Sequence, residues 1–149
     1  MIEKQTIFPH ILVPIDGSQS SVKAGKLAIK LAASEGAHIS FLYVVDGNIV
    51  SQLANASGRI AEQAERELEI SGQHYLDFLT QLAIKADLQT NHFLLHGVPS
   101  TEIEKLAKQI NANLIVIPRM GHQGPRRILI GSVTERVIEF ASCPVLVVK

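Results

Sequence analysis

Short apolar runs alternate along the chain with longer segments in which apolar residues recur at helical spacing. The runs are rich in β-branched residues, as is typical of strands that are buried on both faces of a sheet. They span residues 10–15, 38–45, 113–118 and 144–148, with a weaker candidate at 88–96. The helical segments lie between them, at 19–34, 58–82, 99–110 and 131–141. The pattern therefore predicts five strands that alternate with four helices.

Strand–helix alternation predicts a parallel sheet, because right-handed crossovers place the helices on its two faces. The simplest arrangement is a doubly wound, Rossmann-like α/β fold with strand order 3-2-1-4-5, built by residues 1–149 as a single domain. Ligands of such sheets bind at the carboxyl ends of the strands where the strand order reverses, here between the first and fourth strands. The loops that leave these two strands are Asp16-Gly17-Ser18 and residues 119–130.

The segment 46–57 is polar and rich in small residues, and we expect it to be a mobile loop. Ser57, at its end, is predicted to cap the long helix that follows, because a serine hydroxyl accepts hydrogen bonds from first-turn N–H groups. The third helix is expected to open after Pro99.

The composition describes a chain that can bury a core. Of 149 residues, 46% are apolar and 19% are charged, which is far from the composition of a disordered protein. Fourteen basic residues balance fourteen acidic ones, and this balance argues against a general nucleic-acid binder. The single cysteine, Cys143, excludes an internal disulfide, and no apolar run approaches the ~18 residues of a membrane span. We expect a cytoplasmic protein without a signal peptide and without a nucleic-acid or membrane partner.

The charge is nevertheless uneven. No acidic residue lies between Glu104 and Glu135, whereas five basic residues do. These basic residues are Lys105, Lys108, Arg119, Arg126 and Arg127. A neutral total thus contains one locally positive segment.

The same segment holds Gly121, Gly124 and Gly131, and glycines let a backbone approach a ligand closely. Gly131-Ser132 then opens a helix, whose free N–H groups and positive dipole end attract anions. These features suit phosphate binding. They equally suit a surface loop in which glycines turn the chain and arginines are solvated, so the residues alone leave both interpretations open.

Asp16 ends the first strand at the same edge of the sheet. One interpretation is that it hydrogen-bonds the ribose or base of a nucleotide, facing the glycine-rich segment across the switch point. The other is that it caps the helix that begins after Asp16-Gly17-Ser18. The position suits both roles.

Other kinds of site find little support. The fingerprints G-x-G-x-x-G and G-x-x-x-x-G-K-[ST] are absent. His92 and His96 share one face of a strand, but no cysteine or acidic residue is adjacent in sequence, so no metal site is predicted. No residue is placed to activate Ser132 as a nucleophile, so no catalytic residue is assigned.

Five motifs, taken together in order and spacing, resemble the universal stress protein family over essentially the whole chain. They are ILVPIDGS (11–18), FLYVVD (41–46), GVP (97–99), GSVTERV (131–137) and CPVLVV (143–148). The resemblance implies a cytoplasmic homodimer, paired through the last strand at 144–148. It also implies a regulatory protein that binds ATP or a related adenine nucleotide, with Mg²⁺.

Nucleotide-binding members of that family carry G-x2-G-x9-G-[ST]. Gly121, Gly131 and Ser132 match its second glycine, third glycine and hydroxyl residue, but Pro118 stands where the first glycine belongs. Proline lacks an N–H and holds φ near about −65°. One lost hydrogen bond to a charged phosphate weakens binding by about 1.5–3 kcal/mol.

The resemblance also implies which residues touch the nucleotide. The phosphates are expected on Gly121, Gly131, Ser132 and Val133, with positive charge supplied by Arg119, Arg126 and Arg127. Ribose and adenine are expected to contact Pro14, Ile15, Asp16, Val44 and Ile117. The alternative is an interaction protein of the same fold that has lost nucleotide binding, with Pro118 as its mark. An enzyme is less favoured, and at most slow ATP hydrolysis is expected.

Overall fold

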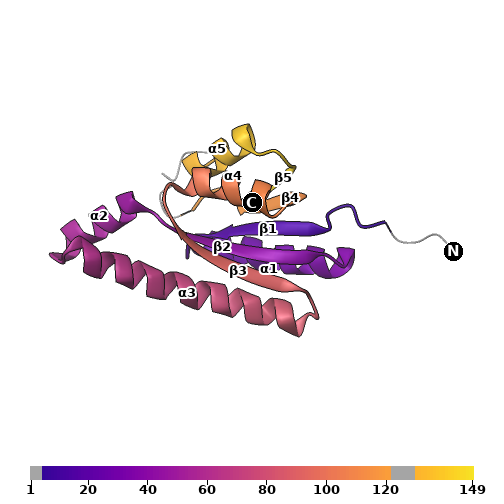
Figure 1. The fold of residues 1–149 in the computed structure, drawn as a ribbon, viewed down its shortest axis with the longest axis horizontal. Coiled ribbons are helices and arrows are strands. Elements are labelled where there is room, and N and C mark those ends of the chain that lie inside the picture. The colour runs from indigo at the N-terminus through magenta and orange to yellow at the C-terminus, as the bar shows by residue number, and fades with distance from the viewer. Residues whose placement is uncertain (1–4, 122–129) are drawn as a thin grey trace.

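The computed structural model describes residues 5–121 and 130–149 and contains a five-stranded parallel sheet with helices on both faces (Figure 1). The strand order is β3-β2-β1-β4-β5, which confirms the predicted order. The elements are β1 (His10–Ile15), α1 (Gln19–Glu35), β2 (His38–Val45), α2 (Gly47–Ser57), α3 (Ala61–Lys85), β3 (Thr90–His96), α4 (Pro99–Gln109), β4 (Leu114–Pro118), α5 (Ser132–Phe140) and β5 (Val145–Val148).

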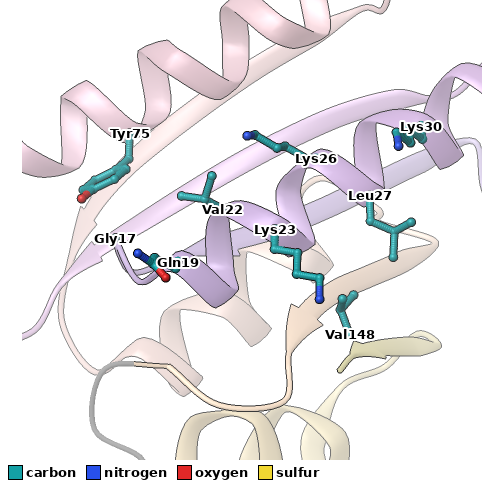
Figure 2. A pocket seen from close by; sticks show the side chains of 9 residues that line it. All are labelled: Gly17, Gln19, Val22, Lys23, Lys26, Leu27, Lys30, Tyr75 and Val148. Carbon is teal, nitrogen blue, oxygen red and sulfur yellow. The ribbon is translucent and has the colours of Figure 1, made fainter.

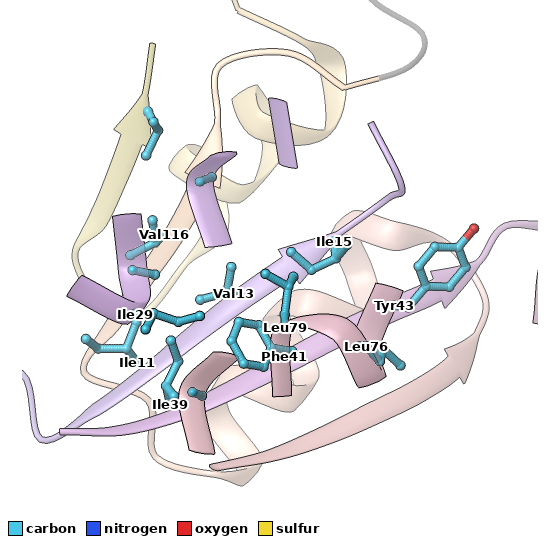
Figure 3. Close-up of a cluster of buried hydrophobic side chains, with 14 of the residues drawn as sticks. Ile11, Val13, Ile15, Ile29, Ile39, Phe41, Tyr43, Leu76, Leu79 and Val116 are labelled. Atoms are coloured by element: carbon cyan, nitrogen blue, oxygen red, sulfur yellow. The ribbon is translucent and has the colours of Figure 1, made fainter. Parts of the chain in front are cut away.

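Alternate residues of the strands feed two apolar cores, one on each face of the sheet. Ile11, Val13 and Ile15 of β1 point into the core under α1 and α3, together with Phe41 of β2 (Figure 3). Leu12 faces the opposite core, under α4 and α5. Burial on both faces explains why these strands are continuous apolar runs.

The sheet opens between β1 and β4, at the switch point. β1 pairs with β2 along six residues, from His10 to Ile15. It pairs with β4 only at Ile11↔Leu114 and Leu12↔Ile115. Beyond that point the carboxyl halves of β1 and β4 are no longer neighbours in a ladder, which leaves room for a cavity.

The prediction of a mobile loop at 46–57 is wrong, because residues 47–57 form helix α2. The Asp46 side chain caps this helix by accepting a hydrogen bond from the Asn48 N–H at 2.9 Å. Val50 and Ala54 are buried one turn apart, and this apolar stripe stabilises the helix despite its polar neighbours.

The predicted capping role of Ser57 is wrong for the same reason. Ser57 is the last residue of α2, and its hydroxyl donates to the Leu53 carbonyl at 2.7 Å. The long helix α3 begins later, at Ala61, after an Ile60 N-cap that makes no side-chain hydrogen bond.

A half-buried histidine pair lies at the amino end of the sheet, away from the switch point. The rings of His10 and His38 stand 4.3 Å apart, and His10 Nε2 lies 2.7 Å from Ser40 Oγ. Burial lowers the pKa of His10 below its ordinary value, and the neighbouring His38 lowers it further. The fold therefore favours the neutral imidazole of His10.

We expect the free energy of unfolding to fall as pH drops below about 6.5, the ordinary histidine pKa. Because the pKa of His10 is lower in the folded state, the unfolded chain binds the proton at a higher pH than the folded chain does. The free energy of unfolding is therefore highest above pH ~6.5 and falls as the pH drops toward the lower folded pKa. Urea unfolding between pH 7.5 and 5 measures this slope. His10→Gln is expected to flatten it, whereas His74→Gln, on the exposed side of α3, serves as the control. Equal slopes in wild type and His10→Gln would contradict the assignment.

Candidate functional site

A cavity of about 490 Å³ lies at the carboxyl ends of β1, β2 and β4. This volume lies within the ~300–1,000 Å³ range of small-molecule sites. Its wall is formed by strand ends, by the first turns of α4 and α5, and by one side of α2 and α3. The lining residues are 14–17, 21, 42–46, 49, 68, 71, 75, 99, 103, 117–118, 121 and 131–134.

The structure brings most of the predicted site residues together in this one wall. They are Pro14, Ile15, Asp16, Val44, Ile117, Gly121, Gly131, Ser132 and Val133. Arg119 is not among the lining residues, and its main chain instead fixes the end of β4. Its N–H donates to the Val148 carbonyl at 2.9 Å, and its carbonyl accepts from the Gly131 N–H at 2.8 Å. Arg126 and Arg127 lie outside the described residues.

The start of α5 presents free backbone donors to the cavity. Gly131 is the N-cap, with φ −68° and ψ 157°, and no side chain among the described residues accepts a capping hydrogen bond from the first turn. The first N–H groups of a helix have no intrahelical partner, and the helix dipole is positive there. Because Ser132, Val133 and Thr134 line the cavity, this end of it is suited to an anion.

Thr134 fastens this helix start to the sheet. Its buried hydroxyl donates to the Pro118 carbonyl at 2.7 Å. The hydrogen bond joins the last residue of β4 to the first turn of α5. Sequence reasoning missed this anchor, since a threonine in a first turn has no partner that can be identified from the sequence alone.

Asp16 and Gly121 meet across the switch point. A Cβ at Gly121 would overlap Asp16 Oδ2, so a larger residue here would displace that carboxylate. The interpretation of Asp16 as a helix cap is wrong, because α1 is capped by Ser18, whose Oγ accepts from the Ser21 N–H at 3.1 Å. Asp16 instead closes the turn, accepting from the Ser18 N–H at 2.9 Å, and its side chain is exposed at the cavity.

Two helices contribute lining residues that the sequence did not reveal. These are Ile49 of α2 and Leu68, Ser71 and Tyr75 of α3. Helix α3 comes this close to the sheet at Gly72, where a Cβ would lie 2.7 Å from Cε1 of the Tyr43 ring. A glycine inside a long helix was the available signal, since it usually has a packing reason.

Tyr43 is a neutral member of the cavity wall. Burial raises the pKa of its hydroxyl, and the Asp16 carboxylate raises it further. Tyr43 therefore stays protonated at neutral pH and adds no negative charge to the site.

A second hollow, of about 560 Å³, runs along α1 beside the first (Figure 2). Its wall includes three lysines from α1, Lys23, Lys26 and Lys30, and it shares Gly17 and Tyr75 with the wall of the switch-point cavity. The three lysines are exposed, and Lys23 Nζ donates to the Lys149 carbonyl at 3.3 Å. The start of α1 borders this hollow at Gln19, but the Ser18 side chain caps that helix, so the cavity at the switch point is the better candidate site.

The two histidines of β3 have separate surroundings. His92 contacts Gln73 and Thr80 of α3, with ring nitrogens 3.2 Å from each polar atom. His96 instead lies beside two glutamates of the same helix. The sequence argument that His96 lacks acidic partners is therefore wrong, because these partners come from a distant segment.

Within residues 5–121 and 130–149, no helix is both long and apolar enough to cross a membrane.

Comparisons with known proteins agree on one family. A family model described as the Universal stress protein family matches residues 8–149. Universal stress protein MJ0531 of Methanocaldococcus jannaschii is 38% identical over 146 residues, which cover 97% of this chain and 84% of that protein. Among solved structures, universal stress protein UspA from Lactobacillus plantarum superimposes with a TM-score of 0.79 at 27% identity, covering 97% of this chain and 100% of that one. The universal stress protein from Archaeoglobus fulgidus in complex with dAMP has a TM-score of 0.68 at 21% identity, covering 97% and 100%.

Proposed function

This chain belongs to the universal stress protein family, and we propose that it binds ATP or a related adenine nucleotide in the cavity between β1 and β4. The observation that carries the proposal is the uncapped start of α5 facing that cavity. The Archaeoglobus fulgidus protein that was solved with dAMP has the same fold, which supports the choice of ligand class. We place the phosphates, the ribose and the base within the cavity from the residues of this chain.

The cavity divides into a polar and an apolar part. The backbone N–H groups of Ser132 and Val133 suit the phosphates, and Mg²⁺ would accompany a triphosphate as its counterion. The Asp16 carboxylate suits ribose hydroxyls, because a carboxylate accepts hydrogen bonds that hydroxyls donate. The apolar strand ends, such as Ile15 and Ile117, suit a flat heteroaromatic base.

The proposed role is regulatory. Residues 1–149 act as one cytoplasmic domain whose nucleotide occupancy is read by other proteins, with slow ATP hydrolysis at most. A nucleotide that is bound without turnover shifts a protein between two conformations only if it binds one of them more tightly than the other. The interaction protein without a ligand is less favoured, because it offers no reason for an uncapped helix start beside a cavity of this size.

Thermal denaturation with nucleotide tests the proposal. If ATP binds with a dissociation constant near 10 μM, 1 mM ATP with Mg²⁺ stabilises the fold by about 2.7 kcal/mol. For a domain of this size the melting temperature then rises by several degrees. Adenosine reports whether the base and ribose suffice for this stabilisation, and inorganic triphosphate reports whether the phosphates do. A flat response to every adenine nucleotide would overturn the proposal and favour the interaction protein.

We further propose a homodimer that is paired through β5. This strand is at the edge of the sheet, and an edge strand exposes backbone groups that can pair with another chain. Leu146 of β5 is partly exposed, as are Ile138 and Phe140 of α5. An apolar edge of this kind suits a second copy of the chain.

We expect the wild type to sediment as a dimer at micromolar concentration and Leu146→Lys to sediment as a monomer. A lysine on an edge strand opposes pairing because its charge would be buried at the interface. Ile84→Lys, at an exposed position of α3, is the matched control and should stay dimeric. A monomeric wild type, or a dimeric Leu146→Lys, would contradict this interface.

A further inference from the structure

Three side chains that can ligate metals meet outside the cavity, although they come from distant segments. They are Glu65 and Glu69 of α3 and His96 at the end of β3, and their ligand atoms lie within 4.8 Å of one another. We propose that they bind one divalent transition-metal ion, with Zn²⁺ preferred, and thereby join α3 to the edge strand β3. The proposal does not depend on nucleotide binding.

The three residues are held by rigid elements. Glu65 and Glu69 are one helical turn apart and therefore share a face of α3, which lies alongside β3 in Figure 1. His96 is the last strand residue and is held by seven consecutive pairings of β3 with β2. Core contacts of Leu76 and Leu79 fix the helix itself. A ligand set on a helix and a strand is better positioned than one on loops.

The distances are close to those of a coordination shell. Glu65 Oε1 lies 3.5 Å and Glu69 Oε1 lies 2.8 Å from the same atom, His96 Nε2. With metal–ligand bonds of about 2.0–2.2 Å at a tetrahedral angle, neighbouring ligand atoms stand about 3.4 Å apart. The pair with Glu65 already has this spacing, and the pair with Glu69 needs a lengthening of about half an ångström. The metal would occupy the place of the proton that His96 Nε2 shares with the carboxylates.

The charge of the cluster also suits a cation. Within residues 5–121 and 130–149, His96 is the sole ion-pair partner of Glu65 and Glu69. The two arginines nearest in sequence are engaged elsewhere, since Arg59 pairs with Glu67 and Arg66 pairs with Glu62. The two carboxylates together carry the charge that one divalent ion neutralises.

The ligand chemistry selects among ions. Mg²⁺ and Ca²⁺ prefer all-oxygen sites, whereas imidazole together with carboxylates suits Zn²⁺. Three protein ligands leave a fourth position for water, which fits the partial exposure of these side chains, between 38% and 47%. The site adjoins the cavity wall, because Leu68, between the two glutamates, lines it.

Isothermal titration of ZnCl2 into nucleotide-free protein tests the proposal. We expect saturable binding of one Zn²⁺ per chain, with affinity at least about tenfold weaker in His96→Gln and in Glu65→Gln. The matched control His92→Gln, from the same strand, should bind as the wild type does. Circular dichroism checks that each variant is folded.

Binding of Co²⁺ provides a second readout, because ligation by His96 changes its visible absorption and His96→Gln should abolish that change. The absence of saturable Zn²⁺ binding, or wild-type affinity in His96→Gln, would overturn the site. Equal competition by Mg²⁺ would overturn the preference for Zn²⁺. Because no nucleotide is present, failure here leaves the proposed nucleotide site untouched, and the reverse also holds.

Discussion

Replacing Gly131 by aspartate is expected to weaken nucleotide binding roughly a hundredfold or more without destabilising the fold. Gly131 is the N-cap of α5, and its φ of −68° and ψ of 157° suit any residue. A Cβ there meets the Met120 Cα at 3.4 Å, an ordinary contact. Aspartate is among the preferred N-caps, and its charge interacts favourably with the helix dipole, so stability should rise by about 0.5–1 kcal/mol.

The same carboxylate would occupy the backbone donors that the phosphates need. It also places a negative charge where the phosphates are expected, so attraction is replaced by repulsion. Together these effects should cost at least about 3 kcal/mol of binding free energy, or roughly a hundredfold in affinity. Calorimetric titration with ATP measures the loss, and a melting curve without ligand measures the stability.

Gly131→Asn is the matched control for charge. Asparagine has nearly the same shape and also caps the helix, but it carries no charge. We expect it to weaken ATP binding less than aspartate does. Wild-type affinity in Gly131→Asp would show that the phosphates do not lie at the start of α5, even if ATP binds elsewhere.

The sheet could be predicted from sequence because each of its features has a local signal. The β-branched runs mark the strands, and their alternation with helices makes 3-2-1-4-5 the simplest order once right-handed crossovers are assumed. The helix α2 could not be identified in this way. Asn48, Ser51 and Gln52 made its polar face look like a loop, although Asp46 has the chemistry of an N-cap.

Some residues of the candidate site could likewise be predicted from the sequence, and others could not. Asp16 and Gly121 were predictable, because the ends of parallel strands meet at one edge of the sheet. Ser71 and Tyr75 were not, since the face of α3 that covers the sheet is set by tertiary packing of Gly72 on the Tyr43 ring. His96 and Glu65 are 31 residues apart in the sequence, and their contact depends on that same packing.

Pro118 is the one position where the sequence departs from the family motif, and the structure shows which way its nitrogen faces. The N–H groups of Ile115 and Arg119 donate to the carbonyls of Pro144 and Val148, so odd-numbered residues of β4 face β5. Backbone groups alternate sides along a strand, so residue 118 faces the side of β1. There β1 has already diverged, and Pro118 lines the cavity. Its carbonyl, on that same side, accepts from Thr134.

Pro118→Gly is therefore expected to place a new N–H donor in the cavity wall and to tighten ATP binding by about ten- to a hundredfold. This range corresponds to one hydrogen bond to a charged group, about 1.5–3 kcal/mol. The unliganded protein should lose about 0.4–1 kcal/mol of stability, because glycine gives the unfolded chain more freedom than proline.

Pro118→Ala distinguishes the effect of the new N–H donor on ATP affinity from the effect of the extra space that glycine also creates. Alanine restores the N–H but keeps a Cβ, so it should tighten binding as glycine does if the donor is what matters. Calorimetric titration of ATP into the three proteins makes the comparison. If neither variant binds more tightly than the wild type, the phosphates do not reach the end of β4. If glycine alone tightens binding, a Cβ at position 118, rather than the missing N–H, limits the site.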